Sequence, residues 1–300
     1  MTGPVESYFS KTAYLPVQSA IRANLKTVIE STAPQEVRRT AIEEAAYAFP
    51  LFSYNLLKLV NSSVFNLKSK VVTLKQAATL PTFDMLADLI RSMPEYPADM
   101  EPTFSAVRFE EHGRATALTV QLLSSLGRRF STLDRERFYT SALLHDVGRI
   151  FLLLSDVQGY RRIIAENTES TSVIDAEKKY YGTDHATVGV LALEAIGIGD
   201  ADLLNGVRQH HETPSGPGVL VAYADRIVKR FGIGPSLAGA MSVSPDAADD
   251  ARLKVALEET IHMTVGDALM HVLSEIDSTL SSGMPQYKSL IGAEMIPLPR

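Results

Sequence analysis

The sequence predicts an all-α fold, and two observations support that prediction. Apolar residues recur at steps of three and four along most of the chain, as they do on the buried face of an α-helix. Runs of alternating β-branched residues, which would indicate strands, are scarce. The chain has 300 residues, 45% of them hydrophobic and 21% charged, and this length and composition suit a globular protein with a sizeable core.

Charge and composition narrow the classes of partner and cofactor. The formal net charge of −6 gives no basic field that would attract a phosphate backbone, so nucleic acid is not the expected partner. The sequence has no cysteine, so any metal ion must be bound by histidine, carboxylate or water. No apolar run approaches the roughly 18 residues that cross a bilayer, and the N-terminus lacks a signal-peptide pattern. We expect a cytoplasmic protein with no membrane partner.

The helical pattern divides the chain into three regions. The N-terminal region, residues 1–98, is predicted to be a helical subdomain, with helical periodicity at residues 32–49, 53–65 and 80–93. The stretch "MPEYPADMEPT" then combines three prolines with three acidic residues and has no period, which indicates a boundary. A second helical unit is predicted over residues 99–232. A C-terminal helical extension is predicted over residues 233–300, where the helices either pack on the domain or form a homodimer.

The second region contains five predicted helices with recognisable ends. They cover residues 107–127, 134–148, 184–197, 200–212 and 218–232. Asp134, Asp184 and Asp200 stand where helix N-caps are expected, because a short polar side chain there accepts a hydrogen bond from the first turn. Glycine ends or closely follows most of these helices, as is common at helix C-termini.

Histidines gather in this second region, on the apolar sides of the predicted helices. Steps of three and four place four histidines and one aspartate within apolar stripes: His112, His145, His185, His210 and Asp225. A single buried histidine is more often an ordinary core residue with a hydrogen bond. Burying four, with His211 and Asp146 beside them, is costly unless a shared ion or a hydrogen-bond network compensates.

The adjacent pair His145 and Asp146 sets a geometric condition on any metal site. Neighbouring residues on a helix point about 100° apart, so both reach one ion only at a helix end or if the aspartate bridges two ions. Gly148, just beyond the pair, indicates such a helix end. Two metal ions on one carboxylate can activate water and bind a phosphoryl oxygen, which is the chemistry of phosphate-ester hydrolysis.

Several blocks of the sequence resemble one protein family in the same order. They are "LLKLVNSSVF" at 56–65, "ALLHDVGRIFLL" at 142–153, "YYGTDHATVGVLAL" at 180–193 and "GVRQHHE" at 206–212. These blocks resemble the HD superfamily of metal-dependent phosphohydrolases, and within it the HDOD group, the HD-related output domains of bacterial signalling proteins. The likeness covers roughly residues 15–232 and implies an HD-superfamily helical bundle with an N-terminal helical subdomain.

The resemblance also implies a set of metal ligands. His112 is similar to the first histidine of the family, His145 and Asp146 to the His-Asp pair, and Asp225 to the distal aspartate. Together these four would hold one divalent ion. A second ion would be held by three further residues that are similar to histidines of the related HD-GYP phosphodiesterases, with Asp146 as the bridge: His185, His210 and His211. The implied cofactor is iron, manganese, zinc, magnesium or nickel at one or two sites.

Two departures from the HD-GYP pattern bear on catalysis. The sequence "TPSGPG" follows "HHE" where those enzymes have a Gly-Tyr-Pro loop that contacts substrate. Arg149 stands where those enzymes place a lysine, and a guanidinium can bind phosphate but does not readily donate a proton. If the site is catalytic, the resemblance assigns the chemistry to Asp146 and Arg149.

Three interpretations of the site therefore stay open at the level of sequence. In the first, the chain is a bacterial signalling module that binds a protein partner or a nucleotide or phosphate ligand, and its cluster stabilises the fold. In the second, it is a working metal-dependent phosphohydrolase or phosphodiesterase. In the third, the cluster is a hydrogen-bonded core network that binds no metal. We favour the first, because a shared fold does not transmit activity.

Overall fold

The computed structural model describes residues 14–96, 106–126, 130–166, 173–212, 216, 218–230 and 247–261. Regular structure in this part of the chain is helical, which confirms the predicted all-α class, and the β-type pairing consists of an isolated bridge between Val17 and Glu95. No helix among these residues is long and apolar enough to cross a membrane. The predicted region boundaries at 98/99 and 232/233 lie outside the described residues.

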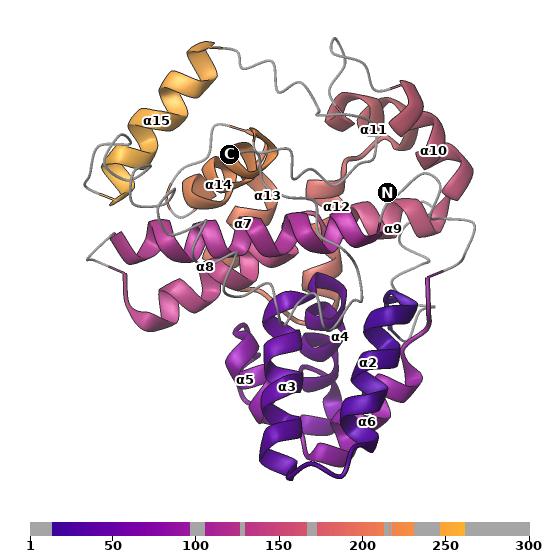
Figure 1. The fold of residues 1–300 in the computed structure, drawn as a ribbon. Coiled ribbons are helices and arrows are strands. Elements are labelled where there is room, and N and C mark those ends of the chain that lie inside the picture. The colour runs from indigo at the N-terminus through magenta and orange to yellow at the C-terminus, as the bar shows by residue number, and fades with distance from the viewer. Residues whose placement is uncertain are drawn as a thin grey trace.

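The N-terminal helices form one group, shown in indigo and purple in Figure 1. They are α2 (Ser19–Glu30), α3 (Gln35–Ala48), α4 (Pro50–Val60), the 3-10 helix η1 (Ser63–Phe65), α5 (Leu74–Thr79) and α6 (Phe83–Ser92). Pro50 starts α4, where the missing N–H costs nothing. Thr73 and Thr82 cap α5 and α6 through their side chains. Asn61 closes the loop after α4 by bonding both the N–H and the carbonyl of Val71 at 2.8 Å.

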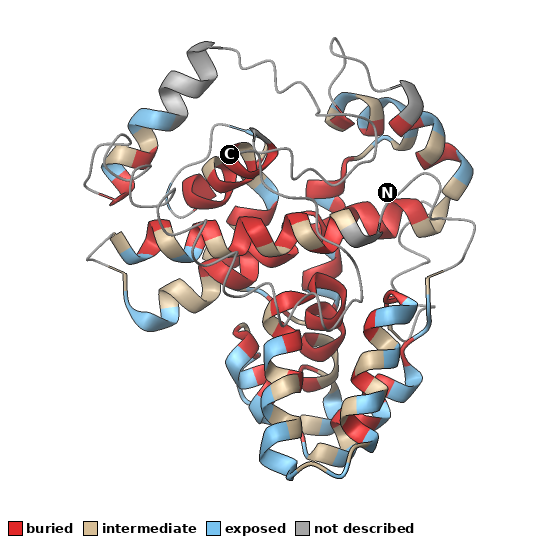
Figure 2. Ribbon diagram, in the orientation of Figure 1, coloured by how far each residue is buried: buried red, intermediate tan, exposed pale blue. Residues whose placement is uncertain are grey.

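The remaining helices form the larger group around the long helix α7. They are α7 (Ala106–Leu126), α8 (Thr132–Leu144), α9 (Val147–Ser155), α10 (Val157–Glu166), α11 (Val173–Tyr181), α12 (His185–Ala195), α13 (Ala201–Gln209), α14 (Gly218–Arg230) and α15 (Ala247–Ile261). Figure 1 shows α7 across the middle of the molecule, with α3 to α6 below it and α13, α14 and α15 above. Buried residues concentrate around this central helix (Figure 2).

The two groups meet where α7 crosses the N-terminus of α4. A Cβ on Gly113 would come within 2.6 Å of Cγ of Pro50 and 3.0 Å of the Leu143 carbonyl oxygen, so the absence of a side chain permits this close approach. Glu110, on the same helix, is fully buried, and the backbone of Leu51 in the first turn of α4 partly offsets the effect of burial on its pKa. The N-terminal group is thus seated directly on the helix that carries His112.

Predicted helix ends in the second group are partly correct. Asp184 and Asp200 cap α12 and α13 by accepting hydrogen bonds from backbone N–H groups, as predicted. Asp134 is not an N-cap. Ser131 caps α8 instead, and Asp134 is its partner three residues later in a capping box. In the C-terminal region, α15 begins at Ala247 and packs against α14 and α7.

Candidate metal centre

Seven polar residues converge at the centre of the larger helical group. They are His112 on α7, His145 and Asp146 between α8 and α9, His185 at the start of α12, His210 and His211 after α13, and Asp225 on α14. Six of them are buried and His211 is half-buried. The structure thus brings together all seven residues that the sequence predicted as metal ligands.

The junction between α8 and α9 aims two adjacent residues at one point. His145 follows the last residue of α8, and Asp146 has non-helical backbone angles (φ −95°, ψ 4°) before α9 begins. The break between the two helices therefore lies before Gly148, whereas the sequence had indicated a helix end at Gly148. Gly148 has another role, because a Cβ there would collide with the backbone carbonyl of His185. Because Gly148 has no Cβ, α9 and α12 can cross closely, which brings His185 beside the junction.

One group of potential ligands surrounds Oδ2 of Asp146. The Nε2 atoms of His112 and His145 each lie 3.7 Å from this oxygen. The same two nitrogen atoms lie 2.9 and 3.5 Å from Oδ1 of Asp225. His112, His145 and Asp146 can therefore offer their ligand atoms to one small volume, and Asp225 contacts the two histidines of this set.

A second group surrounds the other oxygen, Oδ1 of Asp146. The Nε2 atoms of His185 and His210 lie 3.1 and 3.5 Å from it. Nε2 of His185 is also 3.0 Å from Nε2 of His211 and 3.3 Å from Nε2 of His210. Asp146 thus turns one oxygen to each group of histidines, which is the arrangement that a bridging carboxylate requires.

Hydrogen bonds fix the orientation of these histidine rings. Nδ1 of His145 lies 2.7 Å from the carbonyl oxygen of Ala142, and Nδ1 of His210 lies 2.7 Å from that of Val207. A carbonyl oxygen can only accept, so Nδ1 carries the proton in both rings. Nε2 is then left with a lone pair directed into the cluster, which is the tautomer that binds a metal ion.

Glu177 holds the third ring, and the sequence reasoning missed it. Its Oε2 accepts from Nδ1 of His185 at 2.6 Å and from the backbone N–H of the same residue at 2.8 Å, while Oε1 accepts from the Tyr160 hydroxyl at 2.9 Å. All three residues are buried. The available signal was the position of Glu177 one turn after Val173, in a segment that was not recognised as a helix.

Two buried cations face the two aspartates. Nε of Arg149 lies 2.8 Å from Oδ1 of Asp146, and Nζ of Lys229 lies 2.7 Å from Oδ2 of Asp225. Arg149 was predicted from the sequence as a catalytic residue, and the structure places it against a potential ligand, below the protein surface. Lys229 was missed, although its position one helical turn after Asp225 was a usable signal.

These contacts set the protonation states of the cluster. Burial alone raises the pKa of Asp146, but Arg149 and the nearby histidines outweigh it and hold the pKa well below the ordinary value. Burial acts on Asp225 in the same direction, and Lys229 outweighs it in the same way. Burial lowers the pKa of His210 to about 4. The carboxylates are ionised and this histidine is neutral at neutral pH, which are the forms that bind metals.

The donor set fits a divalent ion. Adjacent ligand atoms around an ion at about 2.1 Å are separated by roughly 3.0–3.4 Å in octahedral or tetrahedral geometry. The nitrogen–oxygen contacts between histidines and aspartates given above run from 2.9 to 3.7 Å, and the ligand atoms of each group lie within 4.8 Å of one another. Nε2 of His145, both oxygens of Asp146 and Oδ1 of Asp225 are buried without a well-directed hydrogen bond. Buried polar atoms without such bonds are costly, and a shared cation would compensate them. The cluster can therefore hold a metal ion.

Comparison with known proteins gives the family. The HDOD domain family matches residues 20–213. Among solved structures, the MmoQ response regulator from Methylococcus capsulatus is 16% identical, with a TM-score of 0.64 over 87% of this chain and 99% of that one. A virulence factor from Campylobacter jejuni is 19% identical, with a TM-score of 0.67 over 91% and 97% of the two chains. No curated protein matches the sequence.

The fold and the cluster define an all-α protein with an HD-type arrangement of histidines and aspartates. The chain belongs to the HDOD domain family, because that family matches well over half of its length. The resemblance drawn from the sequence blocks is thereby confirmed.

Proposed function

We propose that this chain is a cytoplasmic regulatory protein that binds a divalent metal ion at its His/Asp cluster and acts by binding a signalling partner. The observation that carries this proposal is the burial of an assembled ligand set. His112, His145 and His185 have no exposed surface, and His211 alone among the seven is half-buried. A site of this kind suits an ion that stabilises the fold better than a substrate that must enter and leave. The similarity to a response regulator agrees with a signalling role.

In this account each residue has a role that its contacts support. His112, His145, Asp146 and Asp225 hold one ion, and Asp146 also faces the histidines that would hold a second one. Bound there, a divalent ion supplies positive charge that stabilises the buried carboxylates and lowers the pKa of any water attached to it. Arg149 and Lys229 supply part of the same charge from the protein itself, which keeps the cluster from depending on metal alone.

A second function is phosphohydrolase or phosphodiesterase activity. It is favoured because the two oxygens of Asp146 face two different groups of histidines. In that case the substrate would approach from the side of His211, and a nucleotide or phosphate ester would be the ligand. Arg149 would then act on the phosphate only indirectly, because its Nε is already paired with the Asp146 carboxylate.

Phosphohydrolase assays distinguish the two functions. The purified protein is loaded with manganese, iron or zinc and incubated with cyclic dinucleotides, nucleotides and p-nitrophenyl phosphate, with Asp146→Ala as the control. The regulatory account predicts no turnover above that control. Hydrolysis that disappears in Asp146→Ala would replace it with the enzymatic account.

A further inference from the structure

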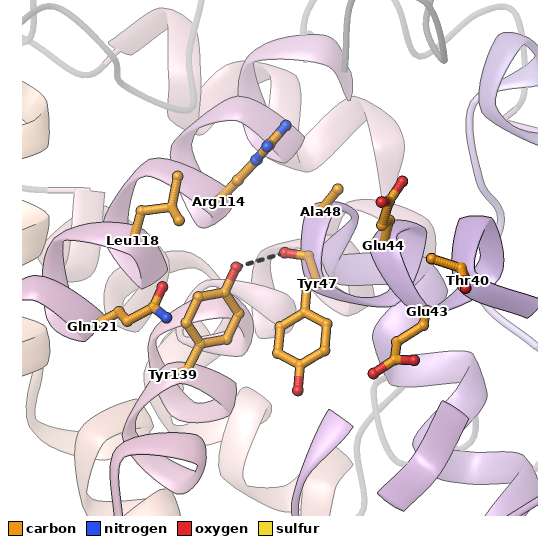
Figure 3. A pocket seen from close by; sticks show the side chains of 9 residues that line it. All are labelled: Thr40, Glu43, Glu44, Tyr47, Ala48, Arg114, Leu118, Gln121 and Tyr139. Carbon is orange, nitrogen blue, oxygen red and sulfur yellow. Dashed lines mark hydrogen bonds between the residues drawn. The ribbon is translucent and has the colours of Figure 1, made fainter. Parts of the chain in front are cut away.

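A pocket of about 330 Å³ lies between the two helical groups, apart from the metal centre. One wall comes from α3, with Glu43, Glu44 and Tyr47, and the other from α7 and α8, with Arg114, Leu118 and Tyr139. Figure 3 shows the two tyrosine rings side by side, between the α3 side chains and the α7 side chains. The pocket therefore exists only because the N-terminal group is seated on α7 and α8.

Hydrogen bonds across this contact hold the pocket in shape. The Tyr139 hydroxyl donates to the backbone carbonyl of Tyr47 at 2.7 Å, and the Tyr47 hydroxyl donates to Oε2 of Glu136 at 2.9 Å. The two rings pack with their centroids 5.3 Å apart, tilted by 60°. A ligand would thus meet aromatic surface that is already positioned, so little ordering would oppose its binding.

Negative charge dominates the α3 side of the pocket. Glu43 and Glu44 both line it, and neither has an ion-pair partner within the described part of the chain. The pKa of Tyr47 is raised, first by burial and then by the carboxylates of Glu136 and Glu43. A cation near these carboxylates and tyrosine rings gains both charge attraction and cation–π contact.

The size of the pocket selects among ligands. Pockets for small molecules run from about 300 to 1,000 Å³, so this one is at the small end and suits a single long side chain rather than a dinucleotide. Leu118 and Ala48 offer apolar surface for a methylene stem, in the way that lysine and arginine stems pack while the charged end stays polar. Gln121, on the opposite wall, carries a side-chain amide that can bond backbone carbonyls of a peptide. Arg114 places one positive charge on that wall, opposite the two carboxylates of α3.

We propose that this pocket binds an arginine or lysine side chain of a partner polypeptide, with Glu43 and Glu44 facing its charge and Tyr47 and Tyr139 packing against it. The proposal rests on the partner-binding part of the proposed function and not on metal binding. It also places the partner on α7, which carries His112 two positions before Arg114, and on α8, which His145 directly follows.

The test uses the full chain and three capped amino acids as probes. N-acetyl-arginine methylamide, its neutral norleucine analogue and its glutamate analogue are titrated separately into protein with ¹³C-labelled tyrosine rings, and the NMR signals of Tyr47 and Tyr139 are followed. We expect saturable shifts with the arginine probe in the millimolar range, and no saturation with the other two. Equal responses to the arginine and norleucine probes would overturn the proposal.

Matched variants assign the binding to this pocket. Glu43→Gln with Glu44→Gln should weaken binding of the arginine probe about tenfold, since the double variant removes both carboxylates that face its charge. The double variant Glu30→Gln with Glu194→Gln removes the same charge from exposed positions elsewhere and should bind as the wild type does. Equal weakening in both double variants would contradict a specific pocket.

Two further measurements separate the possible failures. If free L-arginine binds more tightly than the capped probe, the occupant is an amino acid and the partner-polypeptide assignment is wrong. Metal content is measured on the same samples and should be identical in the pocket variant and the wild type. A protein that binds metal but not the arginine probe would overturn only the pocket, whereas the reverse result would overturn only the metal centre.

Discussion

Arg149 and Asp146 form an ion pair that is buried from solvent, with Nε of the arginine 2.8 Å from Oδ1 of the aspartate. The same carboxylate faces two groups of histidines, so one arginine contributes to the charge balance of the whole cluster. A divalent ion and this guanidinium would therefore act on one carboxylate, and the contributions of the two can be separated by experiment.

Replacing Arg149 should be costly when no metal is present. Removing one partner of a buried ion pair destabilises a protein by about 3–5 kcal/mol, so we expect Arg149→Met to lower the free energy of unfolding by that amount in chelator-treated protein. Urea unfolding measures it, and adding manganese or zinc should recover part of the loss. Arg137→Met is the matched control, because its ion pair with Asp200 is partly exposed and should be worth less than ~1 kcal/mol. Equal losses in both variants would contradict the role given to Arg149.

Glu177 should control metal affinity without being a ligand. Glu177→Gln weakens the bond that orients His185, and loss of such supporting bonds typically reduces metal affinity by about 10–100-fold. Competition with a chromophoric chelator measures the affinity, and circular dichroism checks the fold. Tyr160→Phe removes the other partner of Glu177 and leaves its bonds to His185 in place, so its effect should be smaller. An unchanged affinity in Glu177→Gln would show that His185 is not a ligand.

The crossing of α9 and α12 depends on Gly148. A Cβ there would collide with backbone atoms of His185, so Gly148→Ala should cost at least about 1–3 kcal/mol of unfolding free energy, as overpacking does. Gly189→Ala is the control on the facing helix, because its Cβ would meet a Val207 methyl group at 3.1 Å, and a side chain can move more readily than backbone. Thermal unfolding should give Gly148→Ala a clearly lower melting temperature than Gly189→Ala, and the opposite order would contradict this contact.

Glu110 should give the stability a pH dependence. Burial raises its pKa well above the ordinary value of 4.5, with the Leu51 backbone opposing the shift in part, so the folded chain keeps a proton that the unfolded chain loses. The contribution of Glu110 to the unfolding free energy therefore falls as pH rises from 4.5 toward the raised pKa. Glu110→Gln stays neutral and can still accept a hydrogen bond, so its stability relative to the wild type should increase with pH. Urea unfolding from pH 5 to 8 checks this, and a constant difference would contradict it.

Much of the site could be predicted because its ligands belong to helices with clear periodicity. His112, His185 and Asp225 each share a face with apolar residues, so their inward direction follows from helix geometry alone. Their common meeting point came from the family resemblance, since periodicity does not say which helices touch.

The parts that could not be predicted depend on contacts between distant segments or on local competition. Glu177 lies on α11, which the sequence reasoning did not assign, and it reaches His185 only when α11 packs beside the site. Asp134 was assigned as a cap because it is a good cap residue, but Ser131 occupies that position and uses Asp134 as its partner. The pocket between α3, α7 and α8 arises from the packing of two helical groups and has no signature in any one segment.

The central claim, that the His/Asp cluster binds a divalent metal, is tested most directly by elemental analysis of the purified protein. Wild type and Asp146→Asn are compared before and after reconstitution with iron, manganese or zinc and removal of excess ion. We predict bound metal in the wild type, from substoichiometric as purified to about one or two ions per chain after reconstitution, and loss of that metal in the variant. No retained metal in the reconstituted wild type, or equal metal in both proteins, would contradict the account.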